Sequence, residues 1–253
     1  MMSLRLLDLV SPASALQSLA SQCAVCHSWP ATRVCAACTA RFRQTDARCI
    51  SCALTLAAGL SDGRRTSSLH CAACARQPPP LDSCFAAVSY AYPWSDLVAR
   101  YKVGDDPAWA AVFADRLLHV PGVQASLAAM QAGDWLIPLP LSAERLQSRG
   151  FNQAWELVKA LARQSNTAAG IDARLLLRIR DTLPQARLGR EARLRNLKGA
   201  FVVDPLRVRD IQSRRVLLVA DVMTSGATLF RAAQALREGG AASVGALVFA
   251  RTE

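Results

Sequence analysis

The sequence predicts an α/β protein with a doubly wound, mostly parallel sheet that follows a small cysteine-rich module. Residues 216–220 (Val-Leu-Leu-Val-Ala) form the unbroken apolar run that is typical of a parallel strand covered on both faces. Strand-like and helix-like stretches alternate from residue 85 to residue 250, as they do in βαβ units. Eight of the nine cysteines lie between residues 23 and 74, ahead of these stretches. We therefore expect a small module first and the sheet domain after it.

The order of the expected elements supports this architecture. Strands are expected at residues 85–92, 135–138, 174–180, 200–203, 215–221 and 243–250. Helices are expected at residues 95–102, 108–119, 152–164, 190–197 and 227–238, with a short amphipathic helix at residues 4–11. The run Pro78-Pro79-Pro80 predicts a stiff linker. We therefore place the N-terminal helix and the Cys-rich module in residues 1–77, and the sheet domain in residues 85–253.

Eight cysteines form four identical Cys-x-x-Cys pairs: Cys23 and Cys26, Cys35 and Cys38, Cys49 and Cys52, Cys71 and Cys74. Each such turn directs two thiolates at one point, and two turns complete the tetrahedral sulfur shell that Zn²⁺ prefers. The pairs could therefore hold one or two structural Zn²⁺ ions, and the spacing leaves open which pairs combine. Residues 20–76 contain few large apolar side chains, so we expect their folding to depend on metal. Chelation is expected to leave the rest of the chain folded.

Other roles for the cysteines explain the pattern less well. A thioredoxin-like redox site would need one pair at the start of a helix beside a βαβ unit, which does not account for four pairs. His27 and His70 each adjoin a pair and could replace a thiolate, but eight thiolates suffice, so we expect both to face solvent. Cys84 follows the proline linker at the start of an apolar stretch, where a small buried residue is expected.

No segment of the sequence has the pattern of an export signal or a membrane span. Arg5 and Asp8 interrupt the apolar residues 4–10, which are the best candidate for a signal. Residues 9–32 are uncharged and long enough to cross a bilayer, but they contain Pro12, several Ser, two Gln and the first cysteine pair. We therefore expect a soluble, cytoplasmic protein.

The excess of positive charge is concentrated in one segment. The chain has 30 Lys and Arg against 19 Asp and Glu, which gives a net charge of +11. Residues 174–215 contain twelve basic and four acidic residues, which gives +8. Such a segment could follow a nucleic-acid backbone, and a solvated charged loop explains it equally simply. Because Phe201 is its only aromatic residue, we do not expect a platform on which bases stack.

The segment 219–228 has the chemistry of a phosphate-binding loop. An apolar strand ends at Asp221, and a turn rich in hydroxyl groups then opens the helix at residues 227–238. The backbone N–H groups of residues 224–227, the positive end of the helix dipole and the hydroxyls of Thr224, Ser225 and Thr228 would all favour an anion. Gly226 would allow the backbone to approach it closely. An ordinary capped helix after a strand is the alternative.

This segment resembles the phosphoribosyl-pyrophosphate motif of type I phosphoribosyltransferases. The chain around it resembles the ComF family of phosphoribosyltransferase-like proteins, which is associated with DNA uptake in competent bacteria. The resemblance rests on the cysteine pairs and on these segments: Leu97-x-x-x-Tyr101-Lys102, Ile137-Pro138-Leu139-Pro140-Leu141, Arg149-Gly150-Phe151-Asn152-Gln153-Ala154, and Gly199-Ala200-Phe201, with Gln185, Arg193 and Asn196. It therefore covers nearly the whole chain.

The resemblance implies a role for each matching residue. Asp221 would be the catalytic residue and would bind the ribose, and Thr224, Ser225, Gly226, Ala227 and Thr228 would bind the 5′-phosphate. The loop with Pro138 and Leu139, together with Arg149 and Lys102, would bind the pyrophosphate, over which the basic segment would close. The implied cofactors are structural Zn²⁺ and, for an active enzyme, Mg²⁺ with the phosphoribosyl pyrophosphate.

One departure from the family pattern limits the expected activity. The family usually has two adjacent acids at the strand end, and the first of them is Ala220 here. A methyl group neither binds a ribose hydroxyl nor helps to hold Mg²⁺. Two hypotheses follow: a phosphoribosyltransferase (a glycosyltransferase) active in DNA uptake, or a catalytically weak or inactive cytoplasmic scaffold that binds single-stranded DNA or partner proteins of the uptake machinery. A salvage enzyme for purines or pyrimidines is a weaker third, because no base-specific signature is present.

Overall fold

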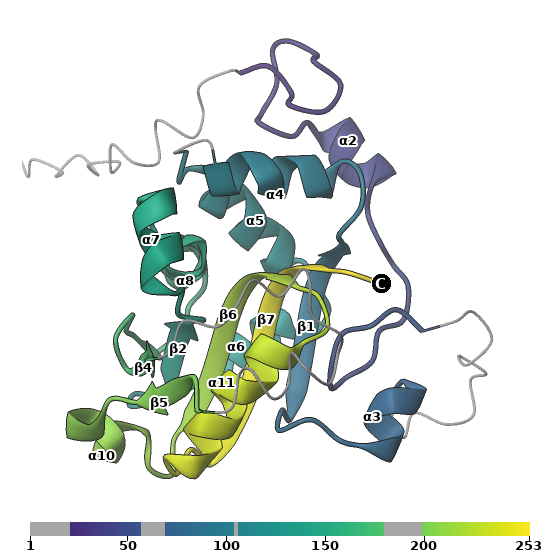
Figure 1. Cartoon of the computed structure of the whole chain (residues 1–253). Helices are drawn as coiled ribbons and strands as arrows, with labels where there is room; N and C mark the ends of the chain where they lie inside the picture. Colours follow the sequence, from purple (N-terminus) through teal and green to yellow (C-terminus); the bar gives the residue numbers. More distant parts are fainter. Residues whose placement is uncertain (1–20, 57–68, 104–105, 180–198) are drawn as a thin grey trace, which may run out of the picture. The chain divides into compact units, whose positions relative to one another are not determined.

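The computed structural model describes residues 21–56, 69–103, 106–179 and 199–253. The chain divides into two compact units, one that ends at Arg43 and one that spans Gln44–Glu253 (Figure 1). The described part of the first unit contains a bridge between Ser21 and Ala31 and the helix α2 (Ala36–Arg41). The compact units divide after Arg43, which is earlier in the chain than the domain boundary expected near Pro78. The expected boundary stays a prediction. The helices expected at residues 4–11 and 190–197 lie outside the described residues.

The larger unit contains strands and helices that largely follow the expected order. Its strands are β1 (Ser83–Ser89), β2 (Trp135–Pro138), β3 (Gly170–Ile171), β4 (Leu176–Arg178), β5 (Phe201–Val203), β6 (Arg215–Met223) and β7 (Ser243–Arg251). Its helices are α3 (Ala72–Arg76), α4 (Trp94–Val103), α5 (Trp109–Leu118), α6 (Val123–Ala128), α7 (Ala143–Arg149), α8 (Gln153–Gln164), α10 (Val208–Ile211) and α11 (Ala227–Glu238), with a 3₁₀ turn at Pro205–Arg207. None of the helices in the described residues is both long enough and apolar enough to cross a membrane.

Five strands form one sheet in the order β1-β7-β6-β2-β3, and every neighbouring pair is parallel. Strand β6 lies at its centre, where Leu217 pairs with Leu136 of β2 and with Gly245 of β7. The burial of β6 explains the apolar run in the sequence, because both faces of this strand are covered. Strands β4 and β5 form a separate antiparallel pair. The predicted α/β class with a mostly parallel sheet is therefore confirmed.

Helices cover both faces of the sheet. Helix α11 packs on β6 and β7 (Figure 1), where Val216 and Leu218 share a buried cluster with Leu236. Side chains alternate between the two faces of a strand, so Phe249 of β7 faces the other side, where its ring stacks on Phe113 of α5 at 3.9 Å. Helix α8 packs on β2 and β6. This double covering is the arrangement that defines a doubly wound sheet.

Several short elements were not expected from the sequence, among them α2, α3, α6, α7, α10 and β3. Helix α7 buries none of its residues, so it has no apolar period to reveal it, and it is bounded instead by the Ser142 cap and by Gly150 at a φ of 73°. Helix α6 has six residues and β3 has two, which is too short for periodicity to show. Strand β6 also continues two residues beyond the expected end at Asp221. This extension carries Val222 and Met223 to the edge of the candidate site.

Candidate functional site

The carboxyl ends of β2 and β6 lie side by side because these two strands pair directly. Pro138 pairs with Val219, and the N–H of Leu139 donates to the carbonyl oxygen of Val219 at 2.8 Å. The Nδ2 of Asn152, which caps α8, donates to the carbonyl oxygen of Leu139 at 3.3 Å. The turn after β2 is therefore held next to the turn after β6, at the edge of the sheet where ligands of this fold class bind.

We call residues 224–228, between β6 and the first turn of α11, the phosphate loop. In the described part of the chain, none of the backbone N–H groups of Thr224, Ser225 and Gly226 donates a hydrogen bond. Unsatisfied N–H groups at the start of a helix give it an affinity for anions. A surface pocket opens here, lined by Leu139, Val222, Met223, Thr224, Gly226, Ala227, Thr228 and Leu229. The loop and the turn after β2 thus line one pocket.

Gly226 allows the phosphate loop to make its turn. Its φ is +78°, and a Cβ atom at this position would lie 2.5 Å from Met223 Cε and 2.7 Å from Phe230 Cζ. We expect Gly226→Ala to lower the free energy of unfolding by roughly 2–5 kcal/mol, because the left-handed backbone costs an L-residue about 1–2 kcal/mol and crowding adds about 1–3 kcal/mol. Urea unfolding followed by circular dichroism measures this change.

Gly150 provides the matched control for this substitution. Its φ is also positive, at 73°, but a Cβ atom there would meet no atom within 4 Å. Gly150→Ala should therefore lose only the backbone contribution, about 1–2 kcal/mol. Equal losses for the two variants would show that contacts inside the phosphate loop do not restrict position 226.

Asp221 lies near the carboxyl end of β6, beside a lysine. Its Oδ2 is 3.3 Å from Lys102 Nζ on α4, and its Oδ1 accepts a hydrogen bond from the N–H of Val222 at 2.7 Å. Oδ2 is buried and accepts no hydrogen bond from a described residue. Burial raises the pKa of Tyr101, and the nearby Asp221 and Glu156 charges raise it further, so the phenol stays neutral. Asp221 is therefore a carboxylate whose Oδ2 forms an ion pair with Lys102 and whose Oδ1 accepts a backbone hydrogen bond.

Ala220 does not belong to the same polar surface as Asp221. It is 1% exposed and lies in the buried cluster with Met223 and Ala227, and it pairs with Val248 of β7. The methyl group of Ala220 therefore fills apolar space. In the motif that the segment resembles, this position before Asp221 is occupied by an acid. The strand end offers one carboxylate to a ligand.

The cysteines form two groups of four. In the first cysteine group (Cys23, Cys26, Cys35 and Cys38) and the second (Cys49, Cys52, Cys71 and Cys74), all four sulfur atoms lie within 4.8 Å of one another. The sulfur atoms of Cys26 and Cys35 are 3.6 Å apart, and those of Cys52 and Cys71 are 3.7 Å apart. These distances fit the edge of a ZnS₄ tetrahedron, about 3.8 Å for Zn–S bonds of 2.3 Å. Neighbouring pairs thus combine, and two metal sites can form.

The environment of the first group lowers the pKa of one of its thiols and raises that of another. Burial opposes ionisation of Cys23, but backbone N–H groups of Cys26, Cys35 and Val25 point to its sulfur and lower its pKa to about 6. The N–H of Cys35 lies 3.3 Å from this sulfur. Burial and the neighbouring sulfurs raise the pKa of Cys38 to about 12. Four crowded thiols cannot all ionise without a compensating cation, and a metal ion supplies that charge.

Comparison with curated proteins identifies the family. DNA utilization protein YhgH of Salmonella typhimurium is 32% identical over 219 residues, which cover 87% of this chain and 90% of the relative. Competence protein F of Haemophilus influenzae is 31% identical over 170 residues, which cover 67% of this chain and 72% of the relative. The chain belongs to the ComF family. Competence protein ComFC of Streptococcus pneumoniae resembles this ComF protein at 29% identity over 159 residues, 63% of this chain and 64% of that one.

Comparison with solved structures finds phosphoribosyltransferases at low similarity. A hypoxanthine phosphoribosyltransferase from Staphylococcus aureus is 12% identical to this ComF protein, with a TM-score of 0.33, over 60% of this chain and 69% of that chain. An allosteric regulatory enzyme of purine biosynthesis is 17% identical, with a TM-score of 0.35, over 60% of this chain and 30% of that chain. No protein-family model matches the chain.

The structure brings part of the predicted site of this ComF protein to one pocket, and Asp221, Lys102, Pro138, Ser225 and Arg149 are outside its lining. Leu139 and four residues of the phosphate loop line the pocket, while Ser225 Oγ accepts from the N–H of Ala227 at 3.5 Å. Lys102 pairs with Asp221. Arg149 is outside the lining of this pocket, and its guanidinium donates to Gln153 Oε1 at 3.0 Å. The basic residues between positions 180 and 198 lie outside the described part of the chain.

Sequence analysis missed Asn152 and Arg251. Asn152 had a local signal, because it occupies the cap position before an expected helix, but its bond to Leu139 depends on the fold. Arg251 follows the apolar run of β7 and is buried, and a single charge at the end of such a run was the available signal.

Cys84 is buried as expected, and burial raises its pKa to about 12. His27 and His70 take no part in either cysteine group.

Proposed function

We propose that this ComF protein binds phosphoribosyl pyrophosphate, or a related phosphorylated ribose, at the pocket beside Asp221, and that it acts in DNA uptake. Among the described residues, the backbone N–H groups of Thr224, Ser225 and Gly226 donate no hydrogen bond at the start of α11, and this observation supports the proposal most directly. The names of the relatives, DNA utilization protein and competence protein, support the biological role.

Each part of the ligand would meet a suitable group. The 5′-phosphate would accept hydrogen bonds from the phosphate loop, where the dipole of α11 adds favourable potential. Asp221 would accept hydrogen bonds from ribose hydroxyls, once Lys102 turns from the carboxylate toward an anionic group. The turn with Pro138 and Leu139, together with Arg149, would face the pyrophosphate. Lys102 and Arg149 supply cationic groups that a pyrophosphate requires.

Transfer from this ligand would require a nucleophile to attack C1 of the ribose while the bond from C1 to the pyrophosphate oxygen breaks. Mg²⁺, when bound with the ligand, would neutralise charge on the departing pyrophosphate. Asp221 would stabilise positive charge that develops on the sugar. Because Ala220 supplies no second carboxylate for a ribose hydroxyl or for Mg²⁺, we propose that the protein binds the ligand and that glycosyl transfer is slow.

We also propose that each cysteine group holds one structural Zn²⁺. The sulfur separations and the four-thiol donor sets fit this metal better than they fit harder cations. Such sites need reduced cysteines, which fits a protein of the cytoplasm.

Isothermal titration of the full chain with phosphoribosyl pyrophosphate and Mg²⁺ tests the proposed binding. We expect a single saturable event, and we expect inorganic phosphate to compete with it at higher concentration because both use the phosphate loop. Ribose without a phosphate group is the control, and it should not bind measurably. Absence of heat at millimolar phosphoribosyl pyrophosphate would contradict the proposal.

A scaffold that binds single-stranded DNA is the second candidate, and it is compatible with the names of the relatives, DNA utilization protein and competence protein. Titration with a single-stranded oligonucleotide at several salt concentrations distinguishes this scaffold from a protein that binds phosphoribosyl pyrophosphate. A phosphate-tracking site loses affinity steeply with salt, with a log–log slope of about −0.7 for each neutralised phosphate. Salt-dependent DNA binding without any binding of phosphoribosyl pyrophosphate would favour the scaffold.

A further inference from the structure

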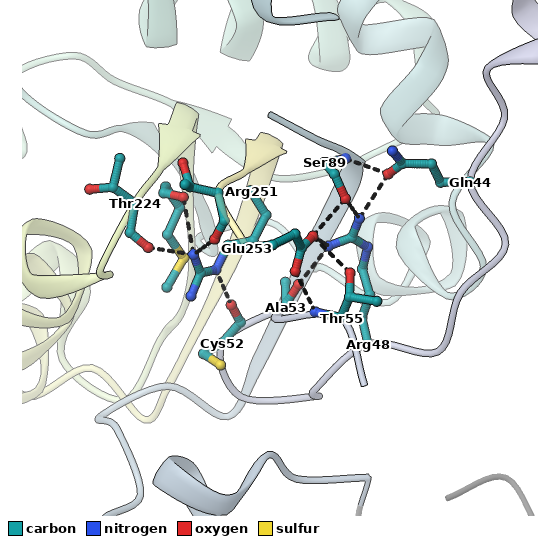
Figure 2. A network of polar contacts seen from close by, with 11 residues as sticks. Gln44, Arg48, Cys52, Ala53, Thr55, Ser89, Thr224, Arg251 and Glu253 are labelled. Carbon is teal, nitrogen blue, oxygen red and sulfur yellow. Dashed lines mark hydrogen bonds and ion pairs between the residues drawn. The ribbon is translucent and has the colours of Figure 1, made fainter. Parts of the chain in front are cut away.

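The side chain of Arg251 connects the second cysteine group with the phosphate loop. Arg251 is the last residue of β7 and is 7% exposed. Its Nε donates to the carbonyl oxygen of Cys52 at 2.9 Å. Its Nη1 donates to the carbonyl oxygens of Met223 at 3.4 Å, of Thr224 and of Thr252 (Figure 2). One guanidinium therefore holds a metal-binding turn and the first residue of the phosphate loop.

The bonding of Arg251 makes this connection rigid. The described residues provide no carboxylate that forms an ion pair with it, so backbone carbonyl groups solvate its charge. A guanidinium is planar, and its donors have fixed directions. If the Cys52 carbonyl moved away from Nε, a buried donor would lose its partner unless the guanidinium moved too. A shift of the guanidinium would in turn disturb its bond with Thr224.

Packing connects the same two segments. The four cysteines of the second group belong to the buried cluster that contains Met223 and Ala227. The thiol of Cys84 lies 3.9 Å from the sulfur of Met223, whose methyl group occupies the space beside Gly226. The apolar contacts therefore connect the second cysteine group with the phosphate loop, as the hydrogen bonds of Arg251 do.

A second polar cluster fixes the other side of the metal-binding turn (Figure 2). Arg48 donates to the carbonyl oxygen of Ala53 at 2.8 Å and forms an ion pair with Glu253 at 3.1 Å. The carboxylate of Glu253 also accepts from the N–H of Thr55 at 2.9 Å and from the hydroxyl of Ser89 at 2.6 Å. These contacts hold residues 53–55 in place. We therefore expect a movement of the cysteines to shift the Cys52 carbonyl against Arg251.

We propose that Arg251 is a positioning residue that couples metal occupancy of the second cysteine group to the conformation of the phosphate loop. The bound metal fixes the turn at residues 49–52, the Cys52 carbonyl fixes the guanidinium, and the guanidinium fixes Thr224. Binding of a phosphorylated ligand then strengthens retention of the metal by the factor by which the metal strengthens ligand binding. This reciprocal part rests on the proposed function, whereas the effect of the metal on the loop does not.

Hydrogen exchange measured by mass spectrometry on the metal-loaded full chain without ligand tests the coupling. We expect Arg251→Met to increase the exchange rate of amides 224–228 about tenfold, within the range typical of coupled sites, while both metals remain bound. Arg215→Met is the matched control, because Arg215 also donates to a backbone carbonyl, that of Ala129, but from the opposite end of β6. Arg251→Lys, which keeps the charge and loses the planar fork, should give a smaller increase and serves if the Met variant does not fold.

A second measurement tests the reciprocal part. In an equilibrium competition with a chromogenic chelator, the wild type should hold the second metal about tenfold more tightly when phosphoribosyl pyrophosphate and Mg²⁺ are present, and Arg251→Lys should show a smaller difference. Unchanged exchange of amides 224–228 in the Arg251 variants would overturn the proposal. If phosphoribosyl pyrophosphate does not bind the wild type, the proposed function fails and the exchange result still decides the coupling. If it binds and the affinity for the second metal does not change, the reciprocal coupling is wrong.

Discussion

Cys74→Ser is expected to destabilise the whole Gln44–Glu253 unit, by about 2.5–4 kcal/mol. Structural zinc sites contribute roughly 10–16 kcal/mol, so one of four thiolates accounts for about a quarter of this amount. The loss is expected to spread beyond the metal-binding turns because Cys49, Cys52, Cys71 and Cys74 lie in the same buried cluster as Leu218 of the central strand. Urea unfolding followed by tryptophan fluorescence and far-ultraviolet circular dichroism measures it, together with the metal content of the protein.

Cys38→Ser in the first cysteine group is the matched control. Cys38 belongs to the compact unit that ends at Arg43, so its loss should remove one metal and leave the unfolding midpoint of the sheet unchanged. From the sequence alone, chelation was expected to leave the sheet domain folded. The shared core changes that expectation for the second group only. Equal unfolding midpoints for Cys74→Ser and the wild type would show that the second group contributes nothing to the sheet.

Elements with an apolar pattern and a clear boundary could be predicted from the sequence. Strand β2 and helix α11 have the expected bounds, and α11 ends where Gly239-Gly240 interrupts it. Helix α7 could not be predicted in the same way, because local capping by Ser142 and Gly150 forms it without any buried face. Periodicity reports burial, so it does not detect a helix that buries nothing.

The parts of the candidate site also differ in how far local sequence determines them. The phosphate loop was predictable because its glycine, its hydroxyls and the preceding acid are consecutive in the chain. The partners of each cysteine pair were not, because the spacing allows several combinations and the fold selects neighbouring pairs. Arg251 was also beyond local analysis, since it contacts Cys52, 199 residues away, and reaches Thr224 only through the pairing of β6 with β7.

Asp221→Asn is expected to weaken binding of phosphoribosyl pyrophosphate by roughly 10- to 150-fold. The amide keeps the shape of the side chain but loses the charge, and hydrogen bonds to charged groups contribute about 1.5–3 kcal/mol. The substitution also leaves Lys102 without the carboxylate that lies 3.3 Å from its ammonium group. Lys102 then adds positive charge near the pyrophosphate, so the loss should be larger for a ligand with ribose hydroxyls than for inorganic pyrophosphate. Calorimetric titration with both ligands measures this difference.

Asp82→Asn controls for the general loss of a carboxylate. Asp82 precedes β1 and pairs with Arg237 at 2.5 Å, beside the amino ends of β1 and β7 rather than the carboxyl ends where the pocket opens. Its substitution should leave the affinity for phosphoribosyl pyrophosphate unchanged. If Asp221→Asn weakens binding of inorganic pyrophosphate as much as binding of phosphoribosyl pyrophosphate, the carboxylate does not contact the ribose. If neither ligand is affected while the wild type binds both, Asp221 lies outside the binding site, and the phosphate loop alone must account for the affinity.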